Sequence, residues 1–278
     1  MTGNPLSTME PWDLVSAGYA QELLPVFSQW AQDSFERVRP QPEHRVIDEA
    51  CGPGTVSLLL ASRVKEIVAF DFLAKMLAEL QNVLAEKDIA NVTARRCDCQ
   101  SIDEADRSFD LAFSQFGLMF FPDLDAGFAE LFRVLKPGGK TAVYSWAPVS
   151  ESPAMRMVME AIWSGFPHLR PKDVEQESFI KGLDNRAIFA EKLNLAGFEQ
   201  VTIEPISHQF RAESALAFWQ GVVRSSAPVA LLKQESTVEA WQVGETGAIA
   251  YLEDAIKGPT ELASTALLGV GVRPTGKG

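Results

Sequence analysis

The sequence predicts an α/β fold, a doubly wound and mostly parallel sheet of seven strands with helices on both faces. Two features lead to this prediction. Between residues 43 and 146, short apolar segments alternate with longer segments in which apolar residues recur every three or four positions. The first apolar segment runs directly into a glycine-rich turn, ACGPG at 50–54. Such alternation is typical of a parallel sheet, whose ligand crevice lies at the carboxyl ends of the strands.

The elements of the first half follow in order. Residues 12–38 have helical spacing and end before Pro40 and Pro42, which cannot continue a helix. Strands are then expected at 45–48, 66–70, 92–96, 109–114 and 141–146, and helices at 55–63, 73–86 and 124–135. Because KPGG at 136–139 combines proline with two glycines, we expect a turn there.

The second half of the chain has a looser pattern. A helix is expected over 186–196, ended by Gly197, and a strand over 201–210. Pro205 lies inside that strand and therefore indicates an edge strand or a bulge. Residues 213–262 have a helical pattern, and the apolar segment ALLGVGV at 266–272 predicts the last strand.

These elements are expected to form one domain. Its parts are N-terminal lid helices (1–42), a first part of the core (43–146), a cover insertion (147–185), the continued core (186–212), a helical cover insertion (213–262) and the last strand (263–278). Function often resides on segments that lie above a rigid scaffold, so the two insertions are expected to cover the substrate. Their Met157, Trp163 and Trp219 indicate either an apolar acceptor pocket or ordinary core packing.

Composition excludes several classes of function. The chain of 278 residues is 46% hydrophobic and has a formal net charge of -12, which disfavours nucleic acid as a partner. The sequence contains no apolar run of about 18 residues, so no membrane span is predicted. The N-terminus lacks the pattern of a secretory signal. Three cysteines in a chain of this length indicate reduced thiols and a cytoplasmic protein. Cys97 and Cys99 lack further ligands, so no metal site is expected.

The glycine turn indicates a ligand with a nucleotide-like part. Glycines at a strand-to-helix turn let a ligand approach backbone N–H groups at the start of a helix. A dinucleotide is one such ligand, but Ser57 stands where its fingerprint requires a third glycine. S-adenosylmethionine is the other.

Several motifs in sequence order then resemble one family. VIDEACGPG (46–54) matches its glycine-rich motif, with Ala50 where glycine is usual, and DFLAKML (71–77) matches its second-strand motif. FDLAFSQFGLMFFPD (109–123) and RVLKPGG (133–139) also match. The chain thus resembles the class I S-adenosylmethionine-dependent methyltransferases of the small-molecule type, related to the quinone C-methyltransferases. This resemblance implies a Rossmann-like methyltransferase fold.

The resemblance also implies a set of cofactor-binding residues. Asp71 would accept the ribose hydroxyls, although a helix N-cap is an alternative role for it. Asp98 would accept from the adenine amino group, and the backbone N–H of Cys99 would donate to a ring nitrogen. The remaining members are Phe72 and Met76 around the adenine, Ala50 and Gly54 in the turn, Asp48 and Gly52 at the methionine end, Ser114 and Gln115 beside the sulfonium, and Tyr19 over the carboxylate. The alternatives are a core tyrosine for Tyr19, core packing on a helix face for Phe72 and Met76, and a surface loop acid for Asp98.

The implied activity is transfer of a methyl group to a small, apolar or aromatic acceptor. No catalytic residue is assigned, since such transfer mainly needs proximity and exclusion of water. Neither His168 nor His208 stands in a pattern that marks a base. The alternatives are an adenosyl-cofactor-binding protein without turnover and a nicotinamide-dependent oxidoreductase. The aromatic residues of the C-terminal insertion could cover a pocket or a second copy, so a homodimer is one alternative.

Overall fold

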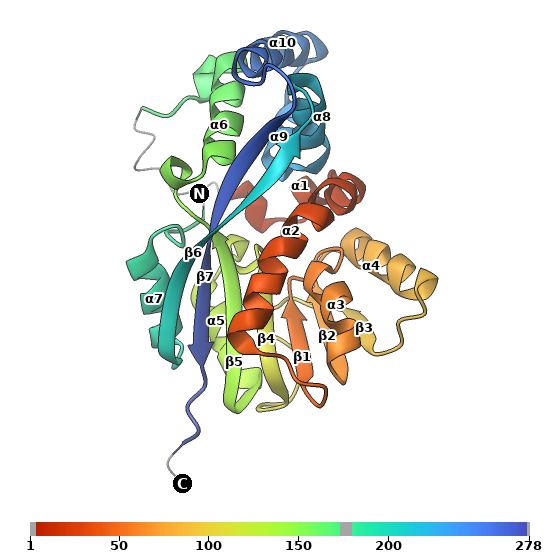
Figure 1. Cartoon of the computed structure of the whole chain (residues 1–278), viewed down its shortest axis with the longest axis vertical. Helices are drawn as coiled ribbons and strands as arrows, with labels where there is room; N and C mark the ends of the chain where they lie inside the picture. Colours follow the sequence, from red (N-terminus) through yellow and green to blue (C-terminus); the bar gives the residue numbers. More distant parts are fainter. Residues whose placement is uncertain (1–3, 173–179, 277–278) are drawn as a thin grey trace.

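One sheet organises the part of the chain that the computed structural model describes, residues 4–172 and 180–276 (Figure 1). Its seven strands lie in the order β3-β2-β1-β4-β5-β7-β6. They are β1 (Arg45–Glu49), β2 (Glu66–Asp71), β3 (Val92–Arg96), β4 (Phe109–Gln115), β5 (Leu135–Trp146), β6 (Glu199–Ala212) and β7 (Thr260–Val272). The first five pair in parallel, and β7 runs antiparallel to both β5 and β6. The predicted mostly parallel sheet is therefore confirmed.

The strand order places a crevice at one point of the sheet. β1 pairs with β2 on one side and with β4 on the other, so the direction of winding reverses there. Ile47 at the centre of β1 is fully buried and lies between Val68 and Ala112. An uninterrupted apolar strand of this kind is typical of a parallel sheet covered on both faces. Ligands bind outside the carboxyl ends of the strands at such a reversal.

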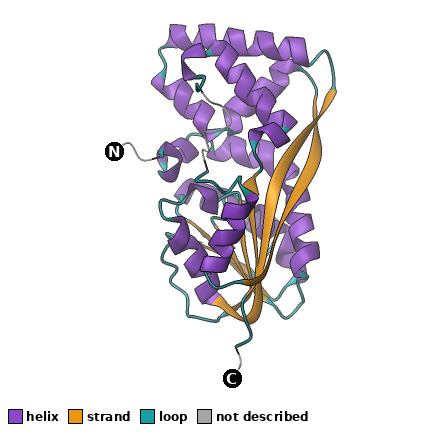
Figure 2. Cartoon of the chain, turned by 90° about the vertical axis from the view of Figure 1, so that its left-hand side faces the viewer, coloured by secondary structure: helices purple, strands orange, loops and turns teal. Residues whose placement is uncertain are grey.

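Helices cover both faces of the sheet (Figure 2). They are α2 (Ser16–Val38), α3 (Thr55–Leu60), α4 (Ala74–Glu86), α5 (Leu124–Val134) and α7 (Arg186–Leu195), and the short helix α1 (Glu10–Asp13) precedes α2. The long helix α2 crosses the sheet and buries Phe27, Trp30 and Phe35, whose spacing puts them on one face. The predicted helical region 12–38 is thus divided into α1 and α2, and α2 ends at Val38 as expected.

Two predicted features of the late sheet differ from the structure. The segment KPGG is part of β5 rather than a turn before it, because pairing with β4 continues on both sides of an irregularity between Phe109 and Leu111. The left-handed conformation of Gly138 (φ 81°) accommodates that irregularity. Pro205 lies in β6, which is an edge strand of the sheet, and this confirms the prediction.

A second layer of helices lies at one end of the molecule. We call α6 (Pro153–Gly165), α8 (Ala215–Ser225), α9 (Ala227–Glu235) and α10 (Val238–Ala255) the helical cap. β6 and β7 extend from the sheet into this cap (Figure 1). The cap has its own apolar cluster, which includes Trp219 and Trp241. The helical prediction for 213–262 is correct in kind, but three helices and the start of β7 occupy that range. Part of the predicted insertion 147–185 lies outside the described residues.

No helix within the described residues is both long enough and apolar enough to cross a bilayer.

Candidate functional site

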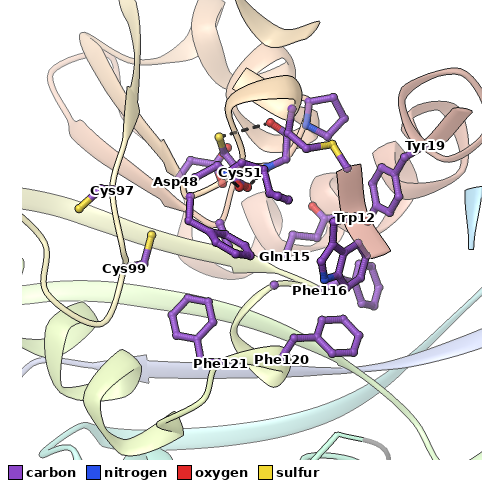
Figure 3. Close-up of a pocket in the computed structure, with 18 of the residues that line it drawn as sticks. Trp12, Tyr19, Asp48, Cys51, Cys97, Cys99, Gln115, Phe116, Phe120 and Phe121 are labelled. Atoms are coloured by element: carbon purple, nitrogen blue, oxygen red, sulfur yellow. Dashed lines mark hydrogen bonds between the residues drawn. The ribbon is translucent and has the colours of Figure 1, made fainter. Parts of the chain in front are cut away.

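A cavity of about 220 Å³ lies at the carboxyl ends of β1, β2 and β4 (Figure 3). Four segments of the sheet edge line it, namely 48–56, 71–76, 97–100 and 115–122. The N-terminal segment closes it with Leu6, Ser7, Trp12 and Tyr19, and α2 adds Phe27. The cavity therefore stands where the strand order reverses.

Most of the predicted site residues line this cavity. They are Tyr19, Asp48, Ala50, Gly52, Asp71, Phe72, Met76, Asp98, Cys99 and Gln115. Gly54 and Ser114 do not line it. Gly54 is the N-cap of α3, where an added Cβ would lie 2.4 Å from Leu80 Cδ1. The Ser114 hydroxyl is fully buried and accepts from the Leu118 N–H at 3.2 Å, at the start of a 3-10 turn (Leu118–Phe120). Both residues thus shape the walls.

The glycine turn presents open backbone to the cavity. Gly52 has a left-handed φ of 54°, and no heavy atom lies within 4 Å of the place where its Cβ would be. Its N–H donates to Asp71 Oδ2 at 2.8 Å, which ties the turn to the end of β2. Ala50 also has a positive φ (50°), the conformation in which glycine is favoured. An added Cβ on Gly117 would lie only 2.4 Å from the Ala50 Cβ, so glycine at 117 makes room for alanine at 50.

Two buried aspartates lie at this end of the cavity. Asp48 accepts from both the hydroxyl (2.6 Å) and the backbone N–H (3.1 Å) of Ser57, and burial raises the pKa of Asp48 to about 7. Asp71 accepts from the N–H groups of Gly52 and Leu73, yet burial still raises the pKa of Asp71 to about 6. The N-cap residue of α4 is Leu73, so Asp71 does not have the alternative role of N-cap.

The described lining of the cavity contains no lysine, arginine or histidine. Negative charge on Asp48 and Asp71 is therefore not neutralised by a protein cation at the cavity wall. A ligand with positive charge would favour the ionised form of both groups.

A third acidic group lies after β3. Asp98 Oδ1 accepts from the backbone N–H of Gln100 at 3.0 Å and from its side-chain amide at 2.9 Å. Cys99 beside it is 4% exposed, and Met76 is 2% exposed on the buried face of α4. These residues, with Phe72, form the wall on the β2–β3 side.

An aromatic wall faces the polar end, and the sequence pattern did not predict most of it. The Trp12 ring lies 5.0 Å from Phe120 and 6.3 Å from Tyr19 between ring centroids. Phe27 lies 4.7 Å from Phe116, which has a positive φ of 60°. Figure 3 shows Trp12, Phe116, Phe120 and Phe121 on this side of the cavity. The motif FDLAFSQFGLMFFPD (109–123) contains Phe116, Phe120 and Phe121, but only Ser114 and Gln115 of this motif were predicted as site residues.

Two polar side chains join this wall. Gln115 donates from its amide nitrogen to the Phe27 carbonyl at 2.8 Å and so fixes the end of β4 against α2. Its other amide atom, Oε1, is buried without a hydrogen-bond partner among the described residues. Burial and the negative charge of Asp71 raise the pKa of Tyr19, so its hydroxyl stays protonated and can donate a hydrogen bond.

Several other candidates lie away from the cavity. Trp163 and Trp219 are buried in the apolar cluster of the helical cap, so core packing is the correct interpretation for them. His208 pairs with Asp33 of α2 and contacts the ring of Trp30. His168 lies next to Phe166 beside the cap. Neither histidine lines the cavity.

Comparison with known proteins agrees with this geometry. A family model described as a methyltransferase domain matches residues 46–139. A demethylmenaquinone methyltransferase from Desulfitobacterium hafniense is 33% identical over 146 residues, and that alignment covers 51% of this chain and 56% of the relative. The chain therefore spans little more than half of that relative's length.

Two of the matching solved structures illustrate the shared fold. The phosphoethanolamine N-methyltransferase 2 of Haemonchus contortus, in complex with S-adenosyl-L-methionine, superposes with a TM-score of 0.56 at 17% identity. The match covers 93% of this chain and 56% of that one. The 4+2 cyclase SpnF superposes with a TM-score of 0.58 at 18% identity over 99% of this chain and 100% of that one.

Proposed function

Because the chain belongs to the class I S-adenosylmethionine-dependent methyltransferases, we propose that it transfers a methyl group to a small, apolar or aromatic acceptor. One observation carries this proposal. A single cavity joins the glycine turn and three aspartates, at the ends of β1, β2 and β3, to a wall of aromatic rings. The polar part suits the cofactor, and the aromatic part suits a planar apolar acceptor.

The residues of the polar part fit this cofactor. When bound, S-adenosylmethionine supplies a methyl group on a positively charged sulfonium, already activated for transfer. We propose that Asp71 accepts from the ribose, since it uses one lone pair of each carboxylate oxygen for Gly52 and Leu73 and keeps others. Asp98 and the Cys99 backbone would hold the adenine between Phe72 and Met76.

At the methionine end, Asp48, Gly52 and Gln115 would bind the charged groups, and the protonated Tyr19 hydroxyl would donate to the carboxylate. The absence of a cation in the described lining supports this assignment, because the ligand itself brings positive charge. The protein's main contribution would be alignment of the two reactants and exclusion of water by the aromatic wall. An acceptor that enters already in its nucleophilic form would need no general base in the cavity.

The acceptor class follows from the aromatic wall and from the names of relatives. The relative from Desulfitobacterium hafniense is named for demethylmenaquinone, an apolar quinone. We propose a quinone-like or phenolic ring as the first acceptor class to test. The net charge of -12 supports a small molecule rather than nucleic acid, and three unpaired cysteines support a cytoplasmic location.

Fold alone does not decide the reaction, because one solved protein of this fold carries the name of a cyclase. The test must therefore detect methyl transfer itself. The purified protein is incubated with S-adenosylmethionine and a panel of hydroquinones, phenols and amines. Mass spectrometry then measures S-adenosylhomocysteine and methylated product for the wild type, Asp71→Ala and Asp103→Ala. Asp103, whose side chain is 96% exposed, provides the matched control.

We expect product from the wild type and from Asp103→Ala, and at least about a hundredfold less from Asp71→Ala. Binding of the adenosyl ligands with no product from any acceptor would support the cofactor-binding protein without turnover instead.

A further inference from the structure

The N-terminal wall of the cavity has a second contact on its outer side. We call residues 4–24 the lid, since Leu6, Ser7, Trp12 and Tyr19 of this segment line the cavity. Helix α8 of the helical cap packs against α2, and α9 packs against α1. Figure 1 shows the cap helices directly beside the start of α2. The lid therefore lies between the cavity and the cap.

Gly18 makes the closest part of this contact. A Cβ added to Gly18 would lie 2.2 Å from the carbonyl oxygen of Arg224 and 2.8 Å from its carbonyl carbon. Both atoms belong to the backbone of α8, so they cannot move aside as a flexible side chain would. The two helices thus touch through their backbones, and only glycine allows this approach.

Polar pairs flank the glycine contact. Glu22, one helical turn after Gly18, pairs with Arg224 at 2.7 Å. Glu10 of α1 accepts from the side-chain amide of Gln234 on α9 at 2.8 Å. The side chains of Glu22 and Arg224 are 27% and 47% exposed, so this pair orients the helices more than it stabilises them.

Tyr19 follows Gly18 directly in the chain. Successive residues of a helix point about 100° apart, so α2 can present Gly18 to α8 and Tyr19 to the cavity. The Tyr19 ring also contacts Trp12 and Phe27, at 6.3 and 5.9 Å between centroids. Any displacement of the first turn of α2 would therefore move the Tyr19 hydroxyl and the aromatic wall together.

We propose that helix α8 of the cap holds Tyr19 in place over the cofactor, with Gly18 as the positioning residue. The cap thereby controls cofactor affinity although none of its residues lines the cavity in the described structure. This inference rests on the proposed cofactor function of the cavity. Because packed helices resist deformation, a shift of α8 would move the first turn of α2 with it through this backbone contact.

The test measures the affinity of S-adenosylhomocysteine by calorimetry for the wild type, Gly18→Ala and Gly221→Ala. Gly221 lies on α8 in the same interface, but its added Cβ would meet only the Glu22 carboxylate, at 3.3 Å. We expect Gly18→Ala to weaken binding about tenfold or more, because a small misplacement of a binding group has effects of this size. Gly221→Ala should stay within about twofold of the wild type.

A double-variant cycle separates positioning from general destabilisation. If Gly18 acts through Tyr19, then adding Gly18→Ala to Tyr19→Ala weakens binding no further. If the two losses multiply, Gly18 acts independently of Tyr19 and the proposal is wrong. Should Gly18→Ala fail to fold, Glu22→Gln replaces it in the same cycle. We expect Glu22→Gln to weaken S-adenosylhomocysteine binding about threefold when Tyr19 is present, and not to weaken it further when Tyr19 is already replaced by alanine.

The proposed function and the role of α8 are contradicted by different results. A wild-type protein that binds no adenosyl ligand contradicts the proposed function. A wild type that binds, with Gly18→Ala and Glu22→Gln at the same affinity, contradicts only the role of α8.

Discussion

Asp48 and Glu49 are adjacent acids at the end of β1, and their side chains point to opposite faces of the sheet. Asp48 reaches the cavity and has Ser57 as its partner. Glu49 is fully buried, and neither of its carboxylate oxygens has a hydrogen-bond partner among the described residues. Burial, with the nearby charge of Glu130, raises the pKa of Glu49 well above its ordinary value. Burial therefore favours the protonated, neutral form of Glu49 in the folded protein.

Glu49 makes stability depend on pH. The folded state holds a proton that the unfolded state releases, so the stability from this group is complete below the ordinary pKa of 4.5 and is lost as pH rises through the folded pKa. Glu49→Gln, which mimics the protonated form, should reduce the fall in the free energy of unfolding between pH 5 and pH 8. Urea denaturation at both pH values measures this. Glu86→Gln, at an exposed position on α4, is the control. If the free energy of unfolding falls as much between pH 5 and pH 8 in Glu49→Gln as in Glu86→Gln, this role of Glu49 is wrong.

Asp48 predicts a pH dependence of cofactor discrimination. The pKa of Asp48 lies at about 7, so this group ionises between pH 6 and pH 8. Negative charge favours S-adenosylmethionine, which carries one positive charge more than S-adenosylhomocysteine. The ratio of the two affinities should rise toward pH 8 by up to about tenfold, the equivalent of one pKa unit. Calorimetry at both pH values tests this, and the rise should disappear in Asp48→Asn; a ratio independent of pH in the wild type would refute it.

At the scale of elements, the glycine turn is held in place because it packs closely against α4. Gly54 combines a φ of 91° with a close approach to Leu80 of α4. A side chain at this position would be strained by the backbone and would also overlap the leucine. The turn and the start of α3 are thus held in one position, which fixes the backbone of Gly52 at the cavity.

Gly54→Ala should therefore lower the free energy of unfolding by about 1–3 kcal/mol. Gly258→Ala provides a matched control, because nothing lies within 4 Å of its added Cβ, and it should change stability by less than about 0.5 kcal/mol. Urea denaturation of both variants gives the comparison. Equal stabilities would contradict the close contact between Gly54 and Leu80 of α4.

The same elements show which parts of the fold are readable from sequence. β1, β2 and β4 were predicted to within a residue or two at each end, since each is an apolar run bounded by turn residues. The start of β5 was missed because proline and glycines suggest a turn, whereas pairing with a neighbouring strand continues past a bulge. The breaks within 213–262 had a signal that was not used: Ser214 and Thr237 cap α8 and α10 with their hydroxyls.

Some residues of the candidate site could likewise be predicted from the sequence, and others could not. Gly52, Asp71 and Asp98 could be predicted to converge because they follow parallel strands whose ends meet at one edge. Trp12 and Phe120 are more than a hundred residues apart in the chain, and only the packing of the lid brings their rings together. Pairings of this kind depend on how helices dock, which the local pattern does not contain.

At the scale of the whole molecule, the buried apolar residues of the described chain form two separate clusters. The larger one surrounds the sheet, and the smaller one belongs to the helical cap. The strands β6 and β7 contribute residues to both clusters. Figure 1 shows these strands running from the sheet into the cap. The cap therefore has fewer buried groups to oppose local opening than the sheet has.

Hydrogen exchange should reveal this difference. Backbone amides of β1 and β4 should exchange most slowly, near the rate set by global unfolding, and those of α6 and α10 should exchange faster. Mass spectrometry of peptides from each element measures the rates. Equal protection of cap and sheet would show that the two clusters unfold as one unit.

Calorimetric titration shows whether the cavity binds an adenosyl cofactor through Asp71. The wild type, Asp71→Asn and Asp103→Asn are titrated with S-adenosylhomocysteine, with NADH as the control ligand. The account predicts binding to the wild type and to Asp103→Asn, none of NADH, and a loss of about 1.5–3 kcal/mol in Asp71→Asn, as expected for hydrogen bonds to a charged group. Binding of NADH instead, or equal affinity in Asp71→Asn, would contradict the account.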